Sequence, residues 1–353
     1  MPLASDRKLY QLRVFGVEED GGSSRVLWFE PPPGALEAFR FEPGQHLTVI
    51  RRGTDGEHRR SYSICSRPGQ PRLAIGVRHV EAGRVSPWLM GLKEGDVVET
   101  LAPGGGFVLG PRLQGRRRFV AIAGGSGVTP LVAMIDQILS TRPDAEVTLV
   151  YGNRSPDTAM LMSWIDGLKS RHLGRLAIHL VYEGGGGELD HAGGLDRIDW
   201  TGLSRRYGFE LASACFLLCG PGAMIEAVRA ALVDLAVPPD AILSEYFAPP
   251  QISAVPPLGS RAGNLEVRID GAPLAIDYRS DGGSILDHLL AAGAPAPFSC
   301  RTAVCGACRA QLVEGEVSMP RAYALRDDEI AEGAILMCQA YCASPRVKID
   351  LRT

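Results

Sequence analysis

Residues 300–308 read Cys-Arg-Thr-Ala-Val-Cys-Gly-Ala-Cys, and a further cysteine follows at position 338. A C-x4-C-x2-C run with one distant cysteine is a spacing that holds a [2Fe–2S] cluster, in which each of two irons receives two thiolates. The small residues Gly306 and Ala307 let the backbone wrap closely around the sulfurs and direct N–H groups at them. The predicted metal ligands are Cys300, Cys305, Cys308 and Cys338.

A zinc site and free thiols are the two alternatives for these cysteines. A structural zinc site usually has two paired C-x2-C knuckles, and this stretch has only one. A disulfide framework is typical of short secreted chains, whereas this chain has 353 residues and begins without the hydrophobic core of a signal peptide. Cys342 follows Cys338 by four residues and is predicted to be a spare thiol.

Residues 265–353 resemble plant-type ferredoxins, because all four cysteines fall in register with that family. The pattern predicts a hairpin over 265–277 and a helix over 284–292, with Ser284 as N-cap and Gly293 as the stop. Strands are predicted at 310–317 and 347–351, and a short acidic helix near 327–331. The resemblance implies an α+β fold of the β-grasp type.

The composition is that of a globular protein, with 45% apolar and 22% charged residues, which excludes a disordered or fibrous chain. The net charge of −3 argues against a nucleic-acid binder, and no apolar run is long enough to span a bilayer. We therefore expect a soluble, cytoplasmic protein with no nucleic-acid or membrane partner. Residues 265–353 carry 12 acidic and 9 basic side chains, so the net acidity lies there. Residues 248–264 hold four prolines and predict a linker before that part.

The first 111 residues consist of short alternating segments separated by Gly, Pro and Asp turns, a pattern typical of an antiparallel barrel or sandwich. Within them, Arg60-Ser-Tyr62-Ser63 resembles the R-x-Y-S motif of the ferredoxin–NADP reductase superfamily. The resemblance implies a β-barrel that binds FAD. In that family the tyrosine packs on the flavin ring, the serine hydrogen-bonds near its N5 atom, and the arginine pairs with the diphosphate.

Two further stretches resemble later elements of the same flavin domain. Residues 76–89 resemble its second motif, in which small residues open a helix and offer N–H groups to phosphate. Residues 103–107, Pro-Gly-Gly-Gly-Phe, resemble the P-x-G-x-F turn that ends the domain. The cofactor-binding residues implied here are Arg78, Val80, Gly83, Val85, Ser86, Pro103 and Phe107.

Residues 112–247 alternate apolar strands with helices, which predicts an α/β domain with a parallel sheet. Gly124-Gly-Ser-Gly-Val-Thr-Pro130 follows an apolar strand and opens a helix. Glycines at such a place let the chain approach a pyrophosphate at the helix N-terminus. The superfamily uses this G-G-x-G-x-T-P variant for the nicotinamide dinucleotide, so Gly125, Gly127, Thr129 and Pro130 are predicted to bind it. A purely structural strand–helix turn is the alternative.

Two short motifs near the end of this domain resemble those that surround the hydride-transfer site. Cys219-Gly220-Pro221 matches the C-G-P motif, and Glu245-Tyr-Phe247 matches the E-x-F element. The resemblance implies catalytic roles for Ser63, Cys219 and Glu245, and cofactor contacts for Gly220, Pro221 and Phe247. A buried cysteine in a strand is also commonplace core packing.

Arg154 and Ser155 come directly after a predicted strand, where the adenosine ribose is read. An arginine there favours a 2′-phosphate, and a serine can donate to it. We therefore expect NADPH as the electron donor, with NADH as the alternative because Asp157 is near. Arg154 as a solvated surface charge is the other interpretation.

The order of flavin barrel, nicotinamide domain, proline-rich linker and ferredoxin domain resembles oxygenase reductases of this superfamily. Such a chain is expected to pass electrons from NAD(P)H through FAD and the cluster to a separate Rieske or di-iron oxygenase, which docks near the ferredoxin domain. We expect the reductase to be monomeric. A stand-alone oxidoreductase that reduces a small acceptor and a redox-sensing module are the rival functions.

Overall fold

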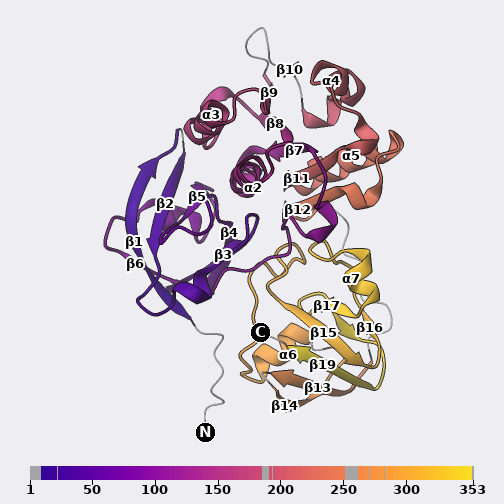
Figure 1. Ribbon diagram of the computed structural model, residues 1–353. Helices are drawn as coiled ribbons and strands as arrows, with labels where there is room; N and C mark the ends of the chain where they lie inside the picture. Colours follow the sequence, from indigo (N-terminus) through magenta and orange to yellow (C-terminus); the bar gives the residue numbers. More distant parts are fainter. Residues whose placement is uncertain are drawn as a thin grey trace. The chain divides into compact units, whose positions relative to one another are not determined.

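The computed structural model describes residues 9–21, 23–184, 191–192, 194–250, 261–269, 271–281 and 283–351 (Figure 1). The chain forms two compact units. The larger unit comprises residues 10–58 and 62–250, and the smaller one comprises residues 251–353, with which residues 59–61 are grouped. Most of the predicted linker, residues 251–260, lies outside the described residues.

The first part of the larger unit is a six-stranded sheet in the order β4-β3-β6-β1-β2-β5. Its elements are β1 (Tyr10–Glu19), β2 (Ser24–Glu30), β3 (His46–Gly53), β4 (Gly56–Ser63), β5 (Leu73–Arg78), α1 (Ser86–Met90) and β6 (Val97–Thr100). Strand pairs β1–β2, β1–β6, β2–β5 and β3–β6 are antiparallel. An antiparallel bridge between Ile64 and Ile75 joins the chain after β4 to β5 and closes the sheet into a barrel. Alternating residues such as Leu12, Val14 and Leu27 are fully buried inside it.

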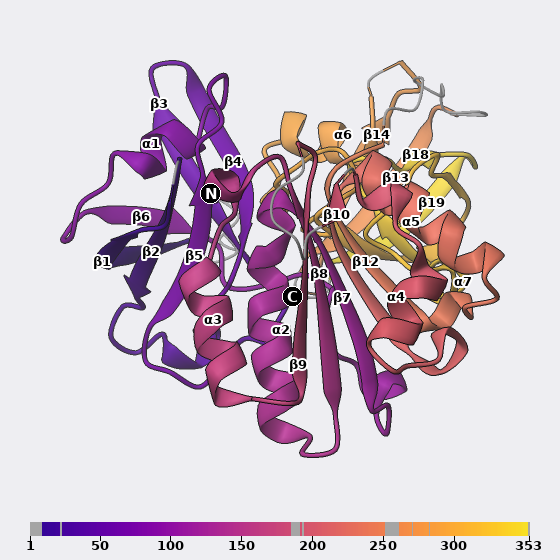
Figure 2. The ribbon, with the colours of Figure 1, turned by 90° about the horizontal axis from the view of Figure 1, so that it is seen from above.

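The second part of the larger unit is a parallel sheet in the order β10-β9-β8-β7-β11-β12. In chain order its elements are β7 (Arg118–Gly124), α2 (Val128–Thr141), β8 (Glu146–Asn153), α3 (Met162–Arg171), β9 (Leu176–Tyr182), β10 (His191–Ala192), α4 (Trp200–Arg206), β11 (Cys215–Pro221), α5 (Gly222–Asp234) and β12 (Ile242–Ala248). Helices α2 and α3 cover one face of the sheet, whereas α4 and α5 lie on the other (Figure 2).

The strand order reverses direction between β7 and β11, because the chain winds outward to β8 and β9 and then returns to β11 and β12. In open α/β sheets, ligands bind beyond the carboxyl ends of the strands at such a switch point. Gly124 ends β7 and Pro221 ends β11, so both predicted nucleotide motifs lie at this position. The topology thus places a ligand site where the sequence predicts one.

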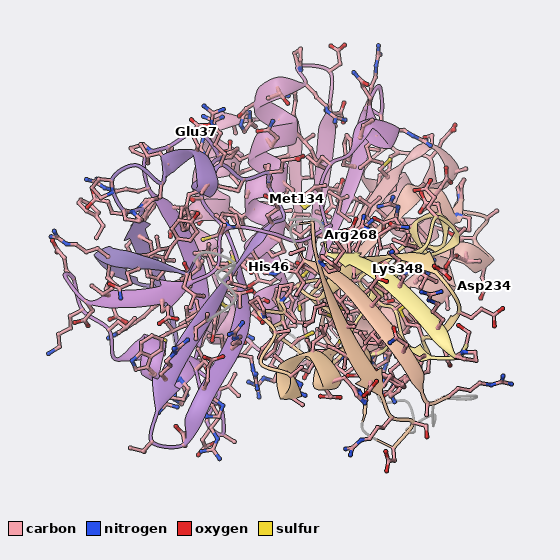
Figure 3. All side chains as sticks on the ribbon, turned by 90° about the horizontal axis from the view of Figure 1, so that it is seen from below. Glu37, His46, Met134, Asp234, Arg268 and Lys348 are labelled. Carbon is pink, nitrogen blue, oxygen red and sulfur yellow. The ribbon has the colours of Figure 1, made fainter. Side chains whose placement is uncertain are left out.

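Helix α2 also joins the barrel to the parallel sheet. Its residue Met134 is fully buried and lies beside Gly44, where an added Cβ would be 3.3 Å from the sulfur (Figure 3). A Cβ at Gly44 would also fall 1.8 Å from the carbonyl oxygen of Phe107, so only glycine fits there. Barrel residues such as Val26 and Ala74 therefore belong to the same apolar cluster as α2 and the parallel sheet. The interior of the barrel forms a separate cluster.

The smaller unit is a five-stranded mixed sheet in the order β14-β13-β19-β15-β17, with a separate β16–β18 pair. Its elements are β13 (Gly263–Ile269), β14 (Ala272–Tyr278), α6 (Ile285–Ala291), β15 (Arg309–Glu314), β16 (Val317–Ser318), α7 (Asp327–Ala331), β17 (Ala334–Leu336), β18 (Tyr341–Cys342) and β19 (Arg346–Leu351). Strands β13 and β19 are parallel neighbours, tied on one face by Lys348 and Glu266 at 2.7 Å (Figure 3). This is the α+β ferredoxin fold that the sequence predicts.

Most of the local predictions for the smaller unit are confirmed. Ser284 caps α6 by accepting a hydrogen bond from the backbone N–H of Asp287, and Gly293 follows the helix with φ of 70°. One prediction was wrong: residues 310–317 are not a single strand. The chain turns at Gly315, where φ is 87° and a Cβ would lie 2.1 Å from the carbonyl oxygen of Arg346. The segment therefore divides into β15 and β16.

In the part of the chain that the structure describes, none of the helices has the length and apolar character needed to cross a membrane.

Candidate functional site

Three side chains predicted to be catalytic meet at the switch point of the parallel sheet. Cys219 on β11 and Glu245 on β12 are direct partners in the parallel register, and the thiol donates to a carboxylate oxygen of Glu245 at 3.7 Å. Ser63, the last residue of β4, forms a hydrogen bond with the same carboxyl group. The end of a barrel strand and the ends of two sheet strands thus converge on one carboxyl group.

This environment changes the acid–base properties of Glu245. Burial raises its pKa to about 8, while hydrogen bonds with Cys219 and Ser63 act in the opposite direction. The same burial raises the pKa of the Cys219 thiol well above its usual range, and the neighbouring Glu245 adds to the effect. At neutral pH Glu245 and Cys219 are therefore both protonated, and both side chains are uncharged.

The predicted dinucleotide turn lies beside these residues. Two of its positions require glycine, each for a different physical reason. Gly127 packs against β11 so closely that a Cβ would be 2.0 Å from the carbonyl oxygen of Cys219. Gly125 has φ of 54°, a conformation that side chains other than glycine rarely adopt. Thr129 is buried and packs on Gly76 of the barrel, while its hydroxyl donates to the carbonyl of Ser126 at 2.9 Å. Close packing therefore explains Gly127 without any ligand; Pro130 is likewise buried, in α2.

Arg78 points toward the dinucleotide turn of the α/β domain. Its guanidinium donates to the carbonyl oxygen of Thr158 at 2.6 Å, and a Cβ at Gly125 would lie 2.8 Å from its Nη1 atom. Partial burial lowers its pKa, with Arg154 adding to this effect. The sequence places Arg78 among the flavin-domain residues, and the structure turns its charge toward the nicotinamide domain.

Arg154 and Ser155 lie just past the end of β8, as predicted. The Arg154 side chain is exposed, and the backbone N–H of Ser155 donates to the hydroxyl of Thr158 at 3.2 Å. Thr158 therefore forms hydrogen bonds with both Arg78 and Ser155. Arg78 and Arg154 together leave a cationic region at the carboxyl end of the sheet.

The other residues predicted to bind cofactors are distributed as follows. On β4, Arg60 is exposed and Tyr62 is half-buried against the barrel core. In the loop before α1, Val80 is 55% exposed, and its N–H donates to the hydroxyl of Ser86 at 3.1 Å. Val85 is buried, Gly83 and Pro103 are partly exposed, and Phe107 belongs to the core shared with α2. Gly220 is buried at the end of β11, whereas Pro221 and Phe247 are exposed.

The four predicted metal ligands form two sulfur pairs in the smaller unit. A hydrogen bond joins Cys300 to Cys305, and another joins Cys308 to Cys338. Within each pair, this bond lowers the pKa of one thiol and raises that of the other. The N–H of Thr302 donates to the Cys300 sulfur at 3.4 Å, so backbone donors face the sulfurs as expected.

The fit of a two-iron cluster can be tested on this arrangement. Among the described residues, no three Cys, His or carboxylate side chains converge so that they could hold one metal ion. Two separate thiol pairs match two irons with two thiolates each better than one tetrahedral zinc. The cysteine loop, residues 300–308, turns tightly because three of its residues have positive φ. These are Arg301, Ala303 and Gly306, with φ of 59°, 66° and 71°. Cys342 lies buried on β18, outside both pairs.

Sequence reasoning missed Asp20, which lies in the turn between β1 and β2. Its two carboxylate oxygens each accept from the backbone N–H of Leu161 at 2.9 Å, directly before α3. This contact ties the barrel to the α/β domain beside Arg78. An acidic residue in a hairpin turn usually has a local role, so no sequence signal identifies it.

Three family models match the chain. An oxidoreductase FAD-binding domain matches residues 21–109, an oxidoreductase NAD-binding domain matches residues 121–230, and a 2Fe-2S iron-sulfur cluster binding domain matches residues 267–343. The matched segments follow the barrel, the parallel sheet and the smaller unit.

Relatives and solved structures match along nearly the whole chain. One of the subunits of 1,2-phenylacetyl-CoA epoxidase from Escherichia coli (strain K12) is 34% identical over 97% of each chain. The ferredoxin reductase component of 3-ketosteroid-9-alpha-monooxygenase from Mycobacterium tuberculosis (strain CDC 1551 / Oshkosh) is 30% identical over 96% of this chain and 95% of its own. Phthalate dioxygenase reductase superposes with a TM-score of 0.59 at 25% identity, over 97% of this chain and 98% of its own. The chain therefore belongs to the family of reductases that combine FAD-binding, NAD-binding and 2Fe-2S domains, and it is an NAD(P)H-dependent flavin iron–sulfur oxidoreductase.

Proposed function

We propose that this oxidoreductase is the electron-supplying component of a multicomponent oxygenase, with a separate oxygenase as its electron acceptor. The observation that carries the proposal is the presence of all three domains in one chain of the same extent as the ferredoxin reductase component of 3-ketosteroid-9-alpha-monooxygenase. NAD(P)H delivers two electrons at once as hydride, whereas a [2Fe–2S] cluster accepts one electron at a time. A flavin can take part in both two-electron and one-electron transfer. This difference explains why the three domains occur together.

The protein's contribution to hydride transfer is mainly positioning and electrostatics. Ser63, Cys219 and Glu245 surround one point at the switch of the sheet, where the two rings would meet. An uncharged Glu245 avoids placing negative charge where hydride moves, and its proton can be shared with Ser63. We assign the catalytic role to these three residues.

Cofactor binding is assigned to residues on both sides of this point. For the flavin we propose Arg60, Tyr62, Ser63, Val80, Gly83, Val85, Ser86, Pro103 and Phe107. For the nicotinamide dinucleotide we propose Gly125, Gly127, Thr129, Pro130, Arg154, Ser155, Gly220, Pro221 and Phe247. Arg78 moves from the first group to the second, because its guanidinium faces Gly125 and Thr158.

We further propose NADPH as the preferred donor. Arg154 is exposed at the end of β8, and Arg78 adds a second positive charge nearby. A 2′-phosphate brings two negative charges that NADH lacks. Cys300, Cys305, Cys308 and Cys338 would hold the cluster that passes single electrons to the partner.

A partner that docks on the smaller unit would meet its acidic side chains. The sequence predicts a short acidic helix near 327–331, and in the structure two of its acidic side chains pair with arginines. Glu329 is held by Arg309 and Arg326, and Asp328 pairs with Arg326 at 2.9 Å. The exposed acidic side chains Asp327 and Glu332 remain for a docking surface. None of the eight cysteines forms a disulfide, and we propose a reducing, cytoplasmic location.

The test is a stopped-flow experiment with the purified holoprotein. NADPH should reduce the flavin first and the cluster afterwards, and the reduced protein should then reduce an oxygenase isolated from the same gene neighbourhood. Failure to reduce any one-electron protein acceptor while a small two-electron acceptor is reduced rapidly would reject the proposal and support a stand-alone oxidoreductase.

A further inference from the structure

A crevice of about 280 Å³ lies between the barrel and helices α2 and α3, within the larger unit. Its walls come from Trp28 of β2, from the segment 65–70 that continues after β4, and from side chains of both helices. The crevice is separate from the carboxyl ends of the parallel strands, because its lining includes none of the residues assigned above. Its volume is slightly below the usual range for pockets that bind drug-sized molecules, and it suits a smaller ligand with one ring.

Two tryptophans give the crevice an aromatic wall. The rings of Trp28 and Trp164 lie 5.7 Å apart with their planes tilted by 34°. Both indole N–H groups donate to the carboxylate of Glu18, at 2.6 and 3.4 Å. Because one carboxylate holds both rings by their polar edges, the aromatic surface is fixed before any ligand arrives.

The charged side chains that line the crevice are unevenly paired. Asp136, which is nine-tenths buried, accepts from the Nε atom of Arg67 at 3.2 Å. Arg171 also lines the crevice, and its guanidinium is 3.8 Å from the same carboxylate while its side chain is 58% exposed. His172 lies 3.9 Å from Asp136, and burial lowers its pKa, so it adds no charge at neutral pH. Arg67 therefore lies closer to Asp136 than Arg171 does, so the exposed Arg171 guanidinium is only loosely paired and can bind a second anion.

Gly167 in the middle of α3 also lines the crevice. Glycine inside a helix costs about 1 kcal/mol relative to alanine. Nothing in the fold requires it, because an added Cβ would meet only the Arg171 guanidinium at 3.5 Å, an ordinary contact distance. The absent side chain instead leaves open space in front of that guanidinium.

We propose that this crevice binds a small anion with a single aromatic ring, such as an aromatic carboxylate. The ring lies against Trp28 and Trp164, and the carboxylate binds the Arg171 guanidinium over Gly167. The ligand contacts the barrel and α3 together, so it stabilises the junction between the flavin and nicotinamide domains.

The experiment measures tryptophan fluorescence and thermal stability of the holoprotein with benzoate as the probe. We expect saturable quenching with a dissociation constant in the millimolar range or tighter, together with a rise in melting temperature. Benzyl alcohol, which has the ring without the charge, and acetate, which has the charge without the ring, should each bind at least roughly tenfold more weakly.

Three variants distinguish the site from general quenching. Arg171→Gln should weaken benzoate binding roughly tenfold to a hundredfold, whereas Arg205→Gln, which removes an exposed arginine from α4, should leave it unchanged. Gly167→Ala should raise the melting temperature and weaken binding, a combination that simple destabilisation does not produce. Absence of saturable quenching, or equal affinity in the wild type and Arg171→Gln, would overturn the proposal.

Discussion

Cys219 and Glu245 are direct partners across the parallel strands β11 and β12, and their side chains meet at 3.7 Å. This pairing places the buried Cys219 thiol beside the half-buried Glu245 carboxyl group, and the pKa of each is raised. Burial raises the pKa of Glu245 to about 8, so the carboxyl changes its charge just above neutral pH.

The first prediction concerns the pH dependence of flavin reduction. In the wild type, the rate constant for flavin reduction by NADPH should fall roughly tenfold as the pH rises through about 8, because an ionised Glu245 opposes hydride transfer. Glu245→Gln should remove this fall, since its side chain stays neutral. Stopped-flow absorbance of the flavin measures the rate. Glu245→Asp keeps a titratable group and should keep a pH-dependent fall; a fall of equal size in Glu245→Gln would assign the titration to another group.

The titration of Glu245 also determines whether the free energy of unfolding rises or falls with pH. Its pKa in the folded protein is above the ordinary value of 4.5, so the unfolded chain releases this proton at lower pH than the folded one does. The wild type should lose stability as the pH rises from about 4.5 to about 8, by about 3–5 kcal/mol relative to Glu245→Gln. Urea unfolding of the two holoproteins across this range measures the difference. A constant difference between them would contradict a raised pKa.

Arg78 and Arg154 should affect the nicotinamide substrates differently. Arg154→Ala should raise the KM for NADPH and leave that for NADH nearly unchanged, because it removes a contact only to the 2′-phosphate. Arg78→Gln should raise the KM for both cofactors, since its guanidinium faces the turn proposed for the shared pyrophosphate. Steady-state kinetics with each cofactor test this. Loss of FAD from Arg78→Gln with unchanged KM values would return this residue to the flavin site.

Cys305→Ser should separate the two halves of the electron path. The variant should lack cluster absorbance and fail to reduce one-electron protein acceptors, while NADPH still reduces its flavin at the wild-type rate. Cys342→Ser is the matched control, because Cys342 is a buried cysteine of the same unit outside both sulfur pairs. Iron analysis and absorbance spectra measure the cluster. If Cys305→Ser slowed flavin reduction while FAD remained bound, the proposed order of electron flow would be wrong.

The elements and their order could be predicted from the sequence because they depend on local patterns. The apolar run before Gly124 indicates a buried strand, and the Ser284 cap marks the start of α6. Short helix α7 occupies Asp327–Ala331, as predicted. Motif resemblance also placed Ser63, Cys219 and Glu245 at one site, although they come from three different strands.

What could not be predicted depends on the directions of side chains in the folded protein. Arg78 lies on a barrel strand, and only the packing of α2 on the barrel turns it toward Gly125. The pairing of Glu329 with Arg309 joins residues 20 positions apart, and it requires β15 and α7 to lie together. Neither direction has a local sequence signal, because tertiary packing decides both.

The last prediction concerns docking of the partner by two exposed acidic residues, Asp327 at the start of α7 and Glu332 directly after it. Long-range attraction between opposite charges accelerates encounter and is screened over a Debye length of about 8 Å at physiological salt. Asp327→Lys and Glu332→Lys should therefore lower the rate of partner reduction at low salt and make it less sensitive to added salt. Both side chains are exposed, so thermal stability should not change.

Glu329→Lys is the contrasting variant in this experiment. Its carboxylate binds Arg309 and Arg326 and also accepts the N–H of Arg326 at 2.9 Å, which caps α7. Its replacement should lower the melting temperature of the smaller unit, whatever its effect on docking. The measurement is the initial rate of oxygenase reduction against ionic strength, with a small neutral acceptor as reference. Charge reversal on a docking surface must change the rate at which oppositely charged proteins associate. If Asp327→Lys and Glu332→Lys reduce the partner at the wild-type rate at every salt concentration, the partner therefore docks on another surface.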